Sequence, residues 1–212
     1  VKIQAPAATR AYKSPRRAAA AAQTKERIVA AARELLATRE GALGFSLEAV
    51  AKKAEVTRLT VYNQFGARRA LLEAVFDDLA LRGGIHRLSA AMAEDDPHVG
   101  LARLVEVFCD FFVLGRAAIE PLIAAGASDP DFKEGLRARN EWRRKALTVL
   151  VGRMQSRGEV HEEAAADLID VLWALTSANF LMDLASGGRE TEKVCVLAQN
   201  LAADAVHRAA AK

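Results

Sequence analysis

The sequence predicts an all-α protein of about nine helices, and three observations lead to this prediction. Only five of its 212 residues are proline, and hydrophobic residues make up 51% of the chain. Its dominant residues, Ala, Leu, Arg and Glu, are good helix formers. Apolar side chains recur at i, i+3, i+4 and i+7 through much of the chain, which is the spacing of one helix face.

The first third of the chain predicts a tail and then short helices. Residues 1–22 are rich in Ala, Pro, Lys and Arg and have no apolar stripe, so we expect a flexible basic tail. Thr24 and Ser46 are the expected N-caps of the first two helices, separated by a loop at 41–45. The expected helices span 24–39, 46–54, 58–64 and 67–79.

The rest of the chain predicts longer helices that form a second domain. Residues 23–70 would form the first domain and 71–212 the second. Residues 101–114 are apolar nearly all round, which is typical of a buried helix. The expected helices of this part span 101–114, 121–127, 131–157, 162–185 and 190–210.

Charge is distributed unevenly along the chain. Residues 1–70 hold 14 Lys and Arg against five Asp and Glu, a net charge of +9. The remaining residues hold 16 against 22, a net charge of −6. A basic first part favours contact with a polyanion, although charge alone is also compatible with a chance surface bias.

Two short helices joined by a three-residue turn, 46–54 and 58–64, are typical of a helix-turn-helix. Val50 and Ala51 would face inward and support the second helix. The major groove of DNA, about 12 Å wide, admits one α-helix. The second helix carries side chains suited to base edges and phosphates, namely Thr57, Arg58, Thr60, Tyr62, Asn63 and Gln64.

The run 45–72 resembles the DNA-binding signature of the tetracycline-repressor (TetR) family, and the likeness extends over 24–76. The matching positions are Ser46, Val50, Ala51, Ala54, Val56, Thr57, Thr60, Tyr62, Phe65, Ala70, Leu71 and Leu72. Two positions depart from the pattern. Glu55 replaces a turn glycine and would be strained at a positive φ, so we expect a slightly altered turn there, and a Glu55 side chain that points at DNA would repel phosphate. Leu59 replaces a small residue.

The resemblance implies roles for the residues of this region. Those expected at the phosphate backbone are Ser46, Thr57, Tyr62 and Arg68, and those expected nearest the base edges are Arg58, Thr60, Asn63 and Gln64. Two alternatives stay open. Tyr62 is either a phosphate contact or a core aromatic, and Leu59 either meets a thymine methyl or packs within the domain.

The resemblance also implies a ligand cavity in the second domain and a homodimer formed by the last two helices, 162–185 and 190–210. The candidate cavity residues are Phe108, Phe111, Phe112, Trp142, Trp173, Thr176, Asn179 and Phe180. Polar groups near them in sequence include Cys109, Arg116, Asn140, Arg143 and Asp183. Such a wall suits a small, largely apolar ligand, although aromatics at helical spacing also suit an ordinary core. Asn179 is the preferred polar anchor because a buried, unpaired amide is costly.

Motifs for other functions are missing from the sequence. Without a P-loop, GxGxxG or GxSxG motif, we expect neither an enzyme nor a bound cofactor. The four histidines are scattered, and Cys109 and Cys195 lack metal-site spacing, so we expect no metal and two buried free thiols. No apolar run approaches the length of a membrane span, and the first residues lack the apolar core of a signal peptide. A cytoplasmic protein is expected.

Together these features predict a sequence-specific transcriptional regulator, a repressor released from operator DNA by a small, largely apolar ligand. One alternative is a helical small-molecule carrier without specific DNA binding. Another is a chromosome-coating protein that binds any duplex. The salt dependence of DNA binding separates the carrier from the regulator.

Overall fold

The computed structural model of the chain describes residues 15–210, and all regular secondary structure in this part is helical, which confirms the predicted fold class. It contains twelve α-helices, a 3₁₀ turn (η1), a π-helical turn (η2) and no strand. The bounds are α1 (Pro15–Leu36), α2 (Gly41–Gly44), α3 (Leu47–Lys53), α4 (Arg58–Phe65), α5 (Arg68–Arg82), η1 (Ile85–Arg87), α6 (Leu88–Ala93), α7 (Pro97–Cys109), η2 (Asp110–Leu114), α8 (Arg116–Gly126), α9 (Pro130–Ser156), α10 (Glu162–Leu175), α11 (Ala178–Ala185) and α12 (Thr191–Ala210).

Three elements account for the difference from the nine predicted helices. The single turn α2 occupies the expected loop at 41–45, and α6 lies in a stretch with no predicted helix. The predicted helix 162–185 is divided into α10 and α11. The division occurs because Ser177 has extended backbone and its hydroxyl accepts a hydrogen bond from the Phe180 amide at 3.2 Å, which starts a new helix.

The first helix begins earlier than the sequence predicts. Residues 15–22, assigned to the tail, form the first turns of α1, and residues 1–14 lie outside the described part of the chain. Thr24 is therefore not an N-cap, and its hydroxyl donates to the Ala20 carbonyl at 2.9 Å within the helix. The physical reason is the run of alanines, whose high helix propensity extends α1 without any apolar stripe.

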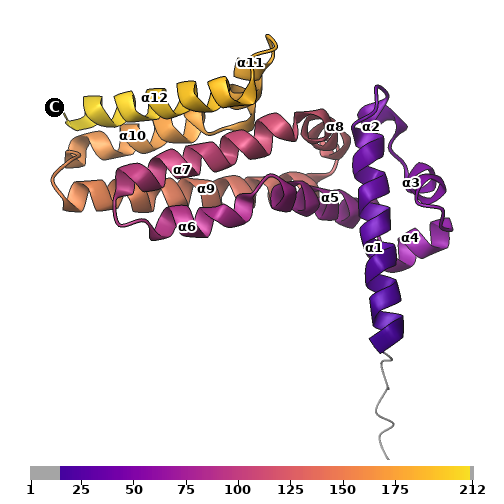
Figure 1. Cartoon of the computed structure of the whole chain (residues 1–212). Coiled ribbons are helices and arrows are strands. Elements are labelled where there is room, and N and C mark those ends of the chain that lie inside the picture. Colours follow the sequence, from indigo (N-terminus) through magenta and orange to yellow (C-terminus); the bar gives the residue numbers. More distant parts are fainter. Residues whose placement is uncertain (1–14, 211–212) are drawn as a thin grey trace, which may run out of the picture.

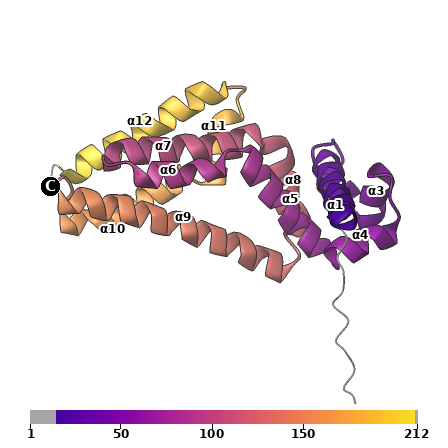
Figure 2. The same ribbon diagram turned by 60° about the horizontal axis from the view of Figure 1, so that its bottom comes forward.

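The helices form two regions, which we call the helix-turn-helix region (α1–α4) and the bundle (α5–α12). In Figure 1, α1 stands across one end of the long bundle, and α12 brings the chain end to the far side. Figure 2 shows α5 running from the bundle towards α1 and α4. Helix α5 packs against α1 on one side and against α8 and α9 on the other, and α8 also packs against α1 and α2, so both α5 and α8 join the two regions.

Packing in the bundle joins distant parts of the chain. Helices α7 and α12 lie side by side, and Cys109 and Cys195, 86 residues apart, form a disulfide between them with their Cα atoms 5.6 Å apart. The prediction of two free thiols is wrong. Spacing along the sequence could not reveal the bond, because it depends on which two helices pack together.

Among the described residues, no single helix has the length and apolarity needed to cross a membrane, and one pair, α10 with α11, passes that test only jointly and with a bend of 49°.

Candidate nucleic-acid interface and ligand cavity

The helix-turn-helix is built by two side-chain caps and a small apolar core. The Ser46 hydroxyl accepts a hydrogen bond from the Ala49 amide at 3.1 Å and starts α3, and Thr57 accepts from the Thr60 amide at 3.1 Å and starts α4. Val50 and Val61 are fully buried between the two helices and their neighbours. These contacts fix the orientation of α4 relative to α3.

The turn between the two helices contains strained backbone. Glu55 has φ 53° and is the one non-glycine residue with positive φ among residues 15–210. Its side chain is exposed, so no packing compensates for the left-handed conformation. The expectation of a slightly altered turn is wrong, because Glu55 keeps the positive φ that a turn glycine would adopt.

The outer face of α4 projects into solvent. Arg58 and Asn63 are exposed, Thr60 and Gln64 are half-buried, and Tyr62 is 57% exposed. Tyr62 is therefore not a core aromatic. Ser46 and Thr57 are also exposed at the starts of α3 and α4, so this set of predicted residues lies on or beside one exposed helix.

Leu59 belongs to the same exposed face. Its side chain is 65% exposed, which excludes the alternative that it packs within the domain. An exposed Leu beside Arg58 and Asn63 gives the surface an apolar contact point among polar groups. That chemistry suits a thymine methyl in the major groove.

Arg68 is the member of the predicted interface that the structure does not place with the others. It is half-buried at the start of α5, where it donates to the Ala125 carbonyl at 2.8 Å and lies over the Phe45 ring at 5.3 Å. Both contacts turn it towards α8 and the α2–α3 connection. Its position suits a link between the two regions better than a phosphate contact.

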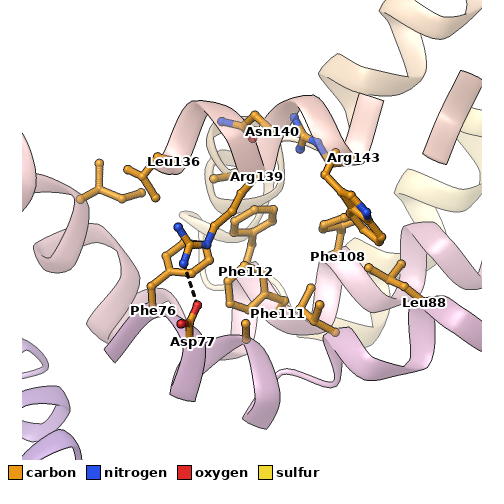
Figure 3. Close-up of a pocket in the computed structure, with 15 residues that line it drawn as sticks. Phe76, Asp77, Leu88, Phe108, Phe111, Phe112, Leu136, Arg139, Asn140 and Arg143 are labelled. Carbon is orange, nitrogen blue, oxygen red and sulfur yellow. Dashed lines mark hydrogen bonds and ion pairs between the residues drawn. The ribbon is translucent and has the colours of Figure 1, made fainter. Parts of the chain in front are cut away.

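A cavity of about 270 Å³ lies within the bundle and is lined by residues of α5, η1, α6, α7, η2, α8, α9 and α11. Figure 3 shows three phenylalanines at its base, Phe108, Phe111 and Phe112. The rings of Phe111 and Phe112 lie 4.7 Å apart, and that of Phe76 lies 5.5 Å from Phe111. Because Phe111 and Phe112 lie in η2, the π-helical turn helps to place consecutive rings in the same cavity wall.

The predicted pocket residues divide into two groups. Phe108, Phe111, Phe112 and Trp142 line the cavity, whereas Trp173, Thr176, Asn179 and Phe180 do not. The preferred anchor, Asn179, is exposed, because the break between α10 and α11 changes which residues of this stretch face inward. Thr176 is fully buried, but its hydroxyl donates a hydrogen bond to the Leu172 carbonyl at 2.8 Å.

Comparisons with known proteins agree with this geometry. Residues 28–75 match the sequence profile of bacterial regulatory proteins of the tetR family, and residues 93–193 match that of the tetracyclin repressor-like C-terminal domain. The chain belongs to the TetR family. It is thus a DNA-binding transcriptional regulator, in a family whose members typically form homodimers and release DNA on binding a ligand.

Solved structures of TetR-family proteins share the fold at low sequence identity. PfmR from Thermus thermophilus is 18% identical, with 84% of this chain and 94% of that chain covered and a TM-score of 0.65. A TetR transcription regulator from Haloarcula marismortui is 16% identical, with 89% of this chain and 98% of that chain covered and a TM-score of 0.64. A TetR-like transcriptional regulator from Rhodococcus sp. RHA1 is 22% identical, with 84% of this chain and 93% of that chain covered and a TM-score of 0.61. No protein of curated function matches the chain.

The cavity of this TetR-family chain also contains charged residues that were not predicted as site residues. Asp77 of α5 and Arg139 of α9 lie in its wall, and Arg139 donates to Asp77 at 2.7 Å and lies over the Phe76 ring at 4.7 Å. Arg143 lies one turn further along α9. Arg143 is one of the polar groups that the sequence placed near the candidate cavity residues, and Arg139 could have been identified from the same stripe of α9, which begins at Phe132.

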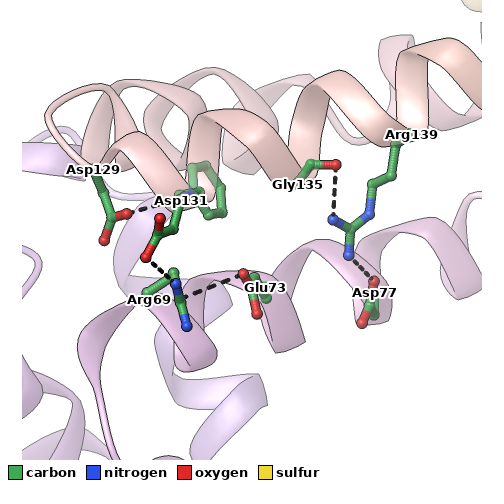
Figure 4. Close-up of polar contacts among 8 residues, drawn as sticks. Arg69, Glu73, Asp77, Asp129, Asp131, Gly135 and Arg139 are labelled. Carbon is green, nitrogen blue, oxygen red and sulfur yellow. Dashed lines mark hydrogen bonds and ion pairs between the residues drawn. The ribbon is translucent and has the colours of Figure 1, made fainter.

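Ion pairs connect the cavity wall to the start of α5. Figure 4 shows two of them between α5 and α9, Arg139 with Asp77 and Arg69 with Asp131. Nε of Arg69 also lies 3.7 Å from Oε1 of Glu73, one turn along α5. Only residues 66 and 67 separate α4 from α5, so these ion pairs connect α9 to the helix that directly follows the exposed helix α4.

Proposed function

We propose that this TetR-family regulator is a repressor that inserts α4 into the major groove of its operator. In this proposal Arg58, Thr60, Asn63 and Gln64 lie nearest the base edges, where guanidinium and amide groups make paired hydrogen bonds to guanine and adenine. Tyr62, Ser46 and Thr57 position the phosphate backbone. The observation that carries the proposal is the exposed, polar outer face of α4, held in place by a buried inner face.

The repressor would be released by a ligand in the bundle cavity. A ligand changes DNA affinity only if it binds one conformer better than the other. The cavity wall includes α9, which is joined to α5 by the Arg139–Asp77 and Arg69–Asp131 pairs. A ligand that moves α9 would therefore rotate α5 and change the spacing of the two α4 helices in a dimer.

The dimer would form through the segments 162–185 and 190–210, that is, through α10, α11 and α12. Both α10 and α12 bury one apolar face inside the subunit, and each leaves a valine partly exposed, Val171 at 42% in α10 and Val196 at 49% in α12. Small exposed residues such as Ala174 would let a partner helix approach closely. A two-fold axis there would present two copies of α4 to one palindromic operator.

The same proposal makes the protein a non-enzymatic component of the cytoplasm, where it has access to chromosomal DNA. The chemistry of the chain supports this, because the exposed groups of α4 suit hydrogen bonding to DNA. The cavity residues suit binding an apolar body rather than transforming it.

Selection from a random duplex pool tests the proposal directly. We expect one palindromic sequence to be enriched, and its affinity to fall steeply with salt because phosphates are neutralised on binding. A carrier would show no binding and no salt slope. A chromosome-coating protein would bind every duplex without enrichment, and either result would overturn the proposal.

A further inference from the structure

Arg143 is a buried guanidinium that faces the cavity without a counter-ion. Its side chain is 3% exposed, one Nη donates to the Thr176 carbonyl, and Nε has no hydrogen-bond partner among the described residues. The nearest aromatic rings are those of Trp173 at 5.3 Å and Phe108 at 5.6 Å. No carboxylate of residues 15–210 forms an ion pair with it.

Neighbouring arginines on α9 make the contrast plain. Arg139, one turn earlier, is paired with Asp77, and Arg144, the next residue, is paired with Asp170. Both of those arginines are partly exposed, and each has a carboxylate. Arg143 is the most deeply buried of the three arginines, yet it is the one that forms no ion pair with a carboxylate in the described part of the chain.

A buried charge without a partner is costly, so its position calls for a physical explanation. Burial lowers the pKa of Arg143 to about 10, and the guanidinium is therefore still protonated at neutral pH. Cation–π contacts with two rings recover part of the lost hydration. The missing negative charge remains, and one anionic group in the adjoining cavity would supply it.

We propose that the ligand of this cavity is a small monocarboxylate with an apolar body, whose carboxylate pairs with Arg143. The inference deepens the proposed function, on which it rests, by naming the ligand class. A single negative charge balances the cavity, because the other cation in its wall, Arg139, is already neutralised by Asp77. A dianionic phosphate would leave one charge uncompensated.

The walls and the volume describe the rest of the ligand. Five aromatic side chains line the cavity, namely Phe76, Phe108, Phe111, Phe112 and Trp142. A volume of about 270 Å³ corresponds to about nine water-sized groups at about 30 Å³ each. Octanoate and phenylacetate have this size and combine an apolar body with one carboxylate.

Calorimetric titration of the full-length protein without DNA tests the ligand class. Octanoate is compared with octan-1-ol, octylamine and octyl phosphate, and phenylacetate with 2-phenylethanol. We expect each carboxylate to bind about 10- to 100-fold more tightly than the matching alcohol, the range for a hydrogen bond to a charged group. Octylamine should bind most weakly, and octyl phosphate less tightly than octanoate.

Variants at two adjacent arginines locate the effect. Arg143→Met keeps the length of the side chain and removes the charge, so octanoate should bind no better than octan-1-ol while octan-1-ol is unaffected. Arg144→Met is the matched control and should keep the full preference for octanoate. Without ligand, Arg143→Met should also unfold at a higher temperature than the wild type, because an uncompensated buried charge is lost.

Several outcomes would overturn the inference. These are equal binding of octanoate and octan-1-ol to the wild type, tighter binding of octyl phosphate, and retention of the carboxylate preference by Arg143→Met. The wild-type series decides the matter even if that variant fails to fold. Because operator selection uses no ligand, enrichment of a DNA sequence together with failure of every carboxylate would remove this inference and leave DNA recognition intact.

Discussion

The contacts that fix the helix-turn-helix region join residues close in sequence, whereas those that fix the bundle join residues far apart. Around α4, polar groups find partners within three residues, as when Thr57 caps the helix at the Thr60 amide. In the bundle the decisive contacts join residues far apart, 86 for Cys109 with Cys195 and 33 for Arg143 with Thr176. Substitutions on the exposed helix should therefore change DNA binding, and substitutions in the bundle should change stability or ligand response.

The disulfide offers the strongest test of this contrast. Cys195→Ala should lower the free energy of unfolding by about 2–4 kcal/mol, because the bond closes a long loop of the unfolded chain. The measurement is urea denaturation without reductant. Treating the wild type with dithiothreitol should reproduce the loss, and the variant should not respond to it. Two titratable thiols in the unreduced, denatured wild type would contradict the expectation.

Arg58→Ala should affect recognition and leave stability unchanged. We expect a loss of about 1–3 kcal/mol in binding free energy at one base pair of the selected operator, with relaxed preference at that position. Titration of single-base operator variants measures the effect. The free energy of unfolding should stay within about 0.5 kcal/mol of the wild type, as is usual for an exposed site. Unchanged base preference would show that Arg58 does not meet a base.

Arg68→Ala tests the residue that links the two regions. Loss of its hydrogen bond to the Ala125 carbonyl should lower the free energy of unfolding by about 1 kcal/mol. Arg69→Ala is the matched control, since its ion pair with Asp131 is largely exposed and should contribute less. Equal stability of the two variants, with all duplexes bound more weakly by Arg68→Ala alone, would favour a phosphate contact instead.

Glu55→Gly should have the smallest effect, and in the stabilising direction. Glycine adopts φ 53° without the steric cost that glutamate bears, and part of the gain is offset by its greater freedom when unfolded. We expect a net rise of about 0.5–1 kcal/mol in the free energy of unfolding. Glu55→Ala retains the strain and serves as the control, so an equal rise in both variants would exclude backbone strain as the cause.

Prediction from sequence succeeded where the physics is local. The cap at Ser46, the short turn between α3 and α4 and the exposed face of α4 all follow from residues at most four positions apart. Prediction was less complete where the packing of helices against one another decides which side chains are buried. Asn179 lies in an apolar run and still faces solvent, because the chain breaks at Ser177 and α11 takes a new direction.

The sequence by itself determined the all-α class, the helix-turn-helix and the chemistry of its outer face, since helix periodicity and capping act within a few residues. Tertiary structure alone decided that two distant cysteines bond, that Arg68 turns towards α8, and that Arg143 is buried without a counter-ion. The reason is physical: a side chain's own helix sets the direction in which it points, and only the neighbouring helices set what it meets there.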